Sequence, residues 1–174
     1  MSLELNLRSR IKALTWFFIV GLVLSGATAI PLQSEVDCLA KVSDAQRWMD
    51  SGGAGAPAWA LMLTQIQAAL QHINTSYPFL FYGMDWLAFG HFAIALAFVG
   101  ALRDPVRNRW LFDFGLMACV LVIPYAFVFG AIRGIPLWWR LIDCSFGVVG
   151  AVPLWFCRKW SRELESRGLA RQRL

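Results

Sequence analysis

The chain has 174 residues, a length that fits either one soluble domain or a handful of membrane-spanning helices. Apolar residues make up 58% of it and charged residues only 16%, and the charges gather near the two ends and between long apolar runs. This pattern argues against a soluble domain and is typical of an integral membrane protein. The net charge of +5 is no sign of nucleic-acid binding, because a basic cluster directly after the last apolar run is typical of a cytoplasmic membrane boundary.

The first apolar run, from about residue 13 to 32, follows a short basic head. It is long enough to cross a hydrocarbon layer of about 30 Å. The order of basic head, apolar core and small residues at Gly26–Ala29 is also that of a cleavable secretory signal. Because the run continues to Leu32 and Pro31 lies beside the most plausible cleavage point, we expect a retained membrane anchor.

Residues 33–77 form the most polar internal stretch and are predicted to fold as an outer helical loop. A first helix is expected from Ser34, where a serine and early acidic residues favour a helix start, to about Asp50. The glycine-rich stretch 51–57 breaks this helix. A second helix is expected over 58–74, where apolar residues recur every three or four positions; it could lie on the membrane surface or cap a bundle.

Three further apolar runs predict three more membrane spans. They cover residues 78–102, 110–132 and 137–157. The head of the chain, the turn 103–109 and the tail 158–174 carry most of the basic residues, which favours a cytoplasmic position for all three. The sequence therefore predicts an all-α integral membrane four-helix bundle, a single membrane domain with both termini in the cytoplasm and the loop 33–77 outside.

Four charged side chains are expected at one depth in the outer leaflet, namely Asp85, Arg133, Arg140 and Asp143. Ionisable groups are costly in hydrocarbon and often mark functional sites. Two acids and two bases would neutralise one another, and Arg140 and Asp143, three residues apart, could pair on one helix face. A ligand site and a purely structural ion-pair network both fit this pattern.

His91 adds a further polar group to the span that carries Asp85. It lies about 9 Å further along the helix axis and about 120° around it, so the two side chains would line one broad cavity without touching. His91 could act as a proton relay, a general acid or base, or a ligand. A hydrogen-bonded core histidine is the simpler interpretation. Tyr82 and Tyr125 are candidate hydrogen-bond partners of a bound molecule.

No cofactor or metal is predicted. The only other histidine, His72, falls in the outer loop, so haem held by two axial histidines is not supported. No second ligand one turn from His91 supports zinc. The four cysteines include no C-x-x-C pair, which leaves no indication of a zinc knuckle or a dithiol redox site.

Asp113 lies about one turn inside the cytoplasmic end of the third span. The neighbouring basic residues Arg103, Arg107 and Arg109 are close enough in sequence to reach it. We therefore expect a salt bridge that locks this turn.

The small residues Gly147, Gly150 and Ala151 follow Asp143 on much the same face of the fourth span. Small residues at such positions allow two helices to approach closely. The pattern predicts that this face of the span points into the bundle.

Several stretches of the second half resemble a group of small bacterial multi-pass membrane proteins of unassigned function. They are Tyr77–Leu80 through Asp85–His91, then Leu102–Asn108, Arg133–Pro136 and Trp139–Gly147. The resemblance covers spans two to four and implies a bacterial inner membrane, but no activity. A coarser likeness, in architecture only, is to membrane proteins of the sterol-isomerase and sigma-2-receptor type; it implies a lipophilic ligand that enters from the bilayer and meets acidic residues.

Three functions are compatible with these features. The first is a membrane protein that binds a small amphipathic or lipophilic ligand, with Asp85, His91, Arg133, Arg140 and Asp143 as polar contacts. If it is an enzyme, Asp85, His91 or Asp143 would transfer protons in isomerisation or hydrolysis. The second is a non-catalytic accessory or scaffold subunit that contacts another membrane protein or a second copy of itself. The third is a proton-coupled transporter that acts as an oligomer.

Overall fold

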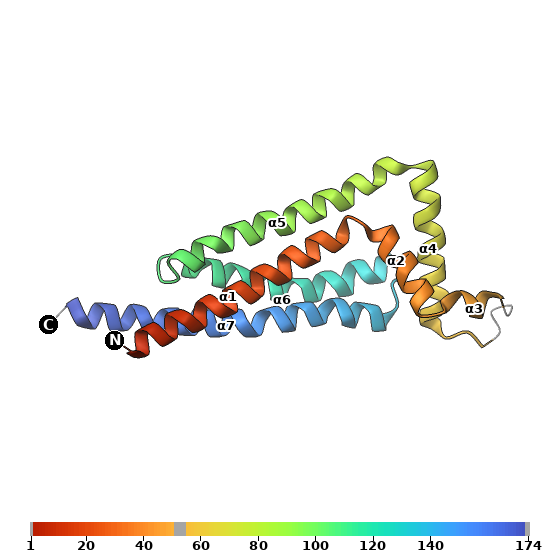
Figure 1. Cartoon of the computed structure of the whole chain (residues 1–174). Coiled ribbons are helices and arrows are strands. Elements are labelled where there is room, and N and C mark those ends of the chain that lie inside the picture. Colours follow the sequence, from red (N-terminus) through yellow and green to blue (C-terminus); the bar gives the residue numbers. More distant parts are fainter. Residues whose placement is uncertain (1, 51–54, 173–174) are drawn as a thin grey trace. The chain divides into compact units, whose positions relative to one another are not determined.

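The part of the protein that the structure describes, residues 2–50 and 55–172 of a computed structural model, is built of helices joined by short turns (Figure 1). The elements in chain order are α1 (Ser2–Ala29), α2 (Leu32–Val42), α3 (Ala45–Asp50), α4 (Ala58–Ser76), the 3-10 helix η1 (Pro78–Phe81), α5 (Tyr82–Arg103), α6 (Arg109–Ile132) and α7 (Leu137–Gln172). The all-α prediction is therefore confirmed. The chain forms two compact units, one of Met1–Leu22 with Ile94–Leu174 and the other of Val23–Ala93.

Four helices are long and apolar enough to cross a membrane, as the sequence predicted. They cover Leu3–Ala29, Pro78–Arg103, Arg109–Ile132 and Leu137–Gly168. With no strand in the described residues, the chain has the fold of a membrane four-helix bundle.

Two of the helices extend well beyond their predicted spans. α1 begins at Ser2 instead of near residue 13, and α7 continues to Gln172 instead of ending near Cys157. In each extension, residues three or four apart are buried: Leu7 and Ile11 in the first, and Ser161 and Leu164 in the second. The charged residues between them are good helix formers, so each amphipathic extension packs on the bundle.

The first unit is built around large side chains contributed by four helices. Ile11 of α1, Phe98 of α5, Phe112 of α6 and Leu154 of α7 are each at most 1% exposed. Gly115 of α6 makes room for this core, because a Cβ atom there would lie 2.7 Å from a methyl carbon of Leu154. A glycine is thus required where α6 faces α7.

Helices α6 and α7 lie side by side along their length (Figure 1). They approach closely at Gly147, where a Cβ atom would lie 2.6 Å from the carbonyl oxygen of Cys119. Gly150 lies one turn further on, and a Cβ atom there would be 3.1 Å from Sγ of Cys119. The predicted close approach at the small residues of this span is confirmed.

The turn between α5 and α6 is closed by polar side chains. The Asp104 carboxylate accepts hydrogen bonds from the backbone N–H groups of Val106 and Arg107, at 3.1 and 3.0 Å. The Asn108 side-chain amide donates to the Gly100 carbonyl at 2.9 Å. These bonds satisfy backbone groups at the ends of both helices.

The second unit contains α2, α3 and α4, which pack around Ala40, Ala45, Ala60 and Leu63. The single helix expected from Ser34 to Asp50 is divided in two, because Asp44 adopts a left-handed backbone conformation with φ of 52°. The predicted second helix is confirmed as α4. Its Gln67 amide donates to the Asp37 carboxylate of α2 at 2.8 Å, which ties the two helices together.

Candidate functional site

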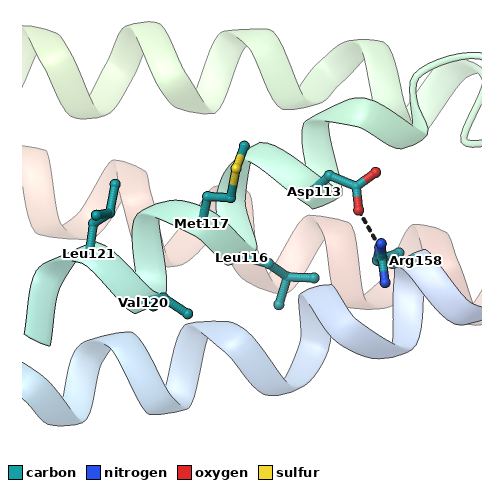
Figure 2. A pocket seen from close by; sticks show the side chains of 6 residues that line it. All are labelled: Asp113, Leu116, Met117, Val120, Leu121 and Arg158. Atoms are coloured by element: carbon teal, nitrogen blue, oxygen red, sulfur yellow. Dashed lines mark hydrogen bonds and ion pairs between the residues drawn. The ribbon is translucent and has the colours of Figure 1, made fainter.

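A hollow of about 620 Å³ lies on the first unit between α6 and α7. Its lining is formed by Asp113, Leu116, Met117, Val120, Leu121 and Arg158. Figure 2 shows the carboxylate of Asp113 and the guanidinium of Arg158 pointing toward each other at one end, with the apolar side chains continuing along α6. The hollow is therefore amphipathic, with a charged end and an apolar remainder.

The charged end is an ion pair in which Arg158 Nε donates to Asp113 Oδ1. The side chains of Arg158 and Asp113 are 33% and 37% exposed, so the pair is accessible from the hollow. A guanidinium group has five N–H donors, and among the described residues Nε–H is the one engaged here. Arg158 can thus hold Asp113 and still donate to a second acceptor.

The ion pair differs from the predicted turn lock. Asp113 pairs across to α7 with Arg158, and Arg109, one of its expected partners, instead pairs with Glu165 of α7. Asp113 and Arg109 are one turn apart on α6, so sequence spacing favoured a local pair. The close packing of α6 on α7 brings both residues a partner from the other helix, and this packing decides the pairing.

A second, smaller hollow of about 270 Å³ lies on the C-terminal half of α7. It is lined by Trp155, Arg158, Lys159 and Arg162, whose spacing of three and four places them on one helix face. Lys159 Nζ lies 5.3 Å from the centre of the Trp155 ring, within the range of a cation–π contact. Arg158 lines both hollows, so the amphipathic hollow and this basic hollow meet at one side chain.

The meeting point of the two hollows follows a long apolar stretch of α7. The stretch from Leu137 to Cys157 rises about 30 Å as an α-helix, which matches the hydrocarbon thickness of a bilayer. Arg158 is the next residue. The charged end of the amphipathic hollow therefore comes directly after a stretch of α7 that is long enough to cross the hydrocarbon of a bilayer.

Three predicted site residues belong to the second unit. Tyr82 and Asp85 are exposed and line a hollow of about 230 Å³ with Trp86 and Phe89. His91 is half-buried, and its Nδ1 lies 2.8 Å from the Leu87 carbonyl oxygen one turn earlier. This bond within its own helix corresponds to the simpler interpretation, a hydrogen-bonded histidine.

Four predicted site residues belong to the first unit. Arg140 donates from Nε to the Ile135 carbonyl at 2.7 Å, and its stem lies over Gly130. The expected pair with Asp143 is not formed among the described residues, because Arg140 is engaged at the turn before α7. Asp143 is half-buried, whereas Arg133 and Tyr125 are exposed. Since Asp85 belongs to the other unit, the gathering of all these groups in one outer-leaflet site stays a prediction.

The cysteine at the end of the fourth apolar run serves as a packing group. Cys157 is fully buried, with its sulfur 3.8 Å from the Thr15 hydroxyl and 3.7 Å from the Ile11 carbonyl oxygen. In the part of the chain that the structure describes, no three His, Cys, Asp or Glu side chains gather closely enough to hold a metal ion.

The fold and these hollows define a multi-pass α-helical membrane protein. Comparisons with models of known protein families, with curated proteins and with solved structures return no match.

The amphipathic hollow was missed in the sequence, although two signals pointed to it. Asp113 is the one acidic residue inside the third apolar run, and Arg158 is the first charge after the fourth. Antiparallel neighbours would bring these two positions to the same depth. Proximity in sequence favours a local partner for Asp113, whereas this correspondence in depth favours Arg158.

Proposed function

We propose that the protein binds a small amphipathic membrane molecule in the hollow between α6 and α7. The observation that carries the proposal is the placement of the Asp113–Arg158 pair at one end of an otherwise apolar hollow. Such a lining is complementary to a molecule with a polar head and an apolar tail.

The polar end must supply most of the selectivity. A ligand that enters from the bilayer already has its tail in an apolar solvent, so moving the tail into the hollow gains little hydrophobic free energy. A charge-assisted hydrogen bond from Arg158 contributes about 1.5–3 kcal/mol. We therefore propose Arg158 as the main ligand-binding residue, with Leu116, Met117, Val120 and Leu121 forming the wall for the tail.

Native mass spectrometry of the purified protein in mild detergent, followed by lipid extraction, tests this function. Val120→Trp would fill the hollow, whereas Val128→Trp places the same side chain at an exposed position of α6 outside it. We expect the wild type and Val128→Trp to retain a small molecule and Val120→Trp to lose it. A wild type that retains nothing, or equal retention by both variants, would contradict the proposal.

A second candidate function is an accessory or scaffold subunit. Two ion pairs, Asp113–Arg158 and Arg109–Glu165, connect α6 to α7, which is what a rigid structural bundle needs. In that case Asp113→Asn would lower the melting temperature, no molecule would be retained, and the protein would co-purify with a membrane partner.

We further propose a bacterial inner membrane as the location, with both termini in the cytoplasm. The proposal is supported by the basic residues at the two ends of the chain and in the turn after α5. With this orientation the amphipathic hollow opens at the cytoplasmic boundary of the membrane.

A further inference from the structure

We infer that the molecule bound between α6 and α7 is an anionic phospholipid, whose phosphate head lies in the basic hollow of α7 and whose acyl chain lies in the amphipathic hollow. This inference rests on the proposed function and names its ligand.

The first argument is the continuity of the two hollows. Arg158 lines both, so a head group held by its guanidinium lies beside Trp155, Lys159 and Arg162. From the same point the wall of Leu116 and Val120 leads along α6 away from Arg158 (Figure 2). The site therefore has one end for a head and one direction for a chain.

The second argument is charge. The two hollows together contain three cations, Arg158, Lys159 and Arg162, against a single carboxylate, Asp113. Lys159 and Arg162 are exposed, and within the described residues neither forms an ion pair. A neutral head group would leave this positive charge uncompensated, whereas a phosphate with no balancing ammonium would neutralise it.

The third argument is depth. Arg158 follows a span-length stretch of α7, and Arg162 lies one turn beyond it, so the cations fall at the level of lipid phosphates. Trp155, one turn before Lys159, is 49% exposed and has the position of an interfacial aromatic side chain. Phospholipid is the source of phosphate that is present at this depth.

The test is a titration of the full-length protein in detergent with phosphatidylglycerol and phosphatidylcholine of identical acyl chains, followed by native mass spectrometry. We expect phosphatidylglycerol to bind about tenfold more tightly. The double variant Lys159→Gln/Arg162→Gln should bind the two lipids with nearly equal affinity. Arg103→Gln/Arg107→Gln removes the same charge from the turn after α5, outside both hollows, and should keep the preference.

The outcomes separate this inference from the proposed function. Equal binding of the two lipids that is lost in Val120→Trp would overturn the anionic preference and leave the proposed function standing. Failure of both lipids to bind would overturn the anionic-phospholipid inference, and a wild type that also retains no other small molecule would contradict the proposed function.

An equal loss of preference in the two charge variants would assign the effect to overall charge and overturn the basic hollow as the head-group site. Glycerol phosphate without acyl chains should bind at least tenfold more weakly than the lipid; equal binding would remove the apolar hollow from the site.

Discussion

Arg158 of α7 donates from Nε to the Asp113 carboxylate of α6, directly after the apolar stretch of α7 that ends at Cys157. The contact is possible because α6 and α7 approach closely at Gly147, which has no side chain to keep them apart. The same guanidinium also lines the basic hollow of α7. A side chain that joins two helices thus also forms the boundary between an apolar and a basic surface.

Asp113→Asn should increase the retention of anionic lipid, because it removes the carboxylate that competes with phosphate for Arg158. Since both side chains are about one third exposed, the loss in unfolding free energy should be about 1 kcal/mol or less. Lipid titration and thermal melting of the same preparation measure the two effects. A loss of lipid binding with unchanged melting would show that Asp113 itself holds the ligand.

Gly147→Ala should destabilise the bundle by about 1–3 kcal/mol, because the added methyl group would meet the Cys119 carbonyl oxygen at 2.6 Å. Gly21→Ala is the matched control, since nothing lies within 4 Å of a Cβ atom at that helical position. The control should be neutral or slightly stabilising. Equal melting temperatures of the two variants would argue against the close approach of α6 and α7.

Asp85→Ala should leave both the melting temperature and the retained lipid unchanged, because the Asp85 side chain is exposed and lies outside the hollow between α6 and α7. Exposed substitutions of this kind typically change unfolding free energy by about 0.5 kcal/mol or less. If Asp85→Ala instead abolishes retention with unchanged melting, the ligand binds at the outer-leaflet site predicted from the sequence.

Cys38 should react with a membrane-impermeant thiol reagent added to the outside of intact spheroplasts, because it is exposed on α2 in the predicted outer loop. A cysteine introduced by Ser166→Cys in a Cys38→Ser background lies on the exposed C-terminal part of α7 and should react only after lysis. The reverse pattern of labelling would invert the proposed orientation.

The four spans could be predicted from the sequence because length and hydropathy alone define them. The ends of α1 and α7 could not. Their extensions are amphipathic, with Leu7 and Ser161 buried among charged neighbours, so hydropathy falls at the membrane boundary while the helix continues. Periodicity within the charged segments, at Leu7 and Ile11 for example, was the signal that would have extended them.

The pairing of charged residues was less predictable than the spans. Spacing along the chain favoured Arg140 with Asp143 and Arg109 with Asp113, yet Arg140 bonds to a turn carbonyl and Arg109 to Glu165. In both cases a partner from outside the same helical turn replaces the local one. Single-helix spacing contains no information on that competition.

Photocrosslinking is the most direct test of the central claim, that an amphipathic ligand lies between α6 and α7. Phosphatidylglycerol with a diazirine in its acyl chain would be irradiated with the full-length protein, and the labelled peptides identified by mass spectrometry. We predict that the wild type is labelled at Met117, Val120 or Leu121. This labelling should be lost in Val120→Trp and kept in Val128→Trp. Labelling confined to other helices, or identical labelling of all three proteins, would contradict the claim.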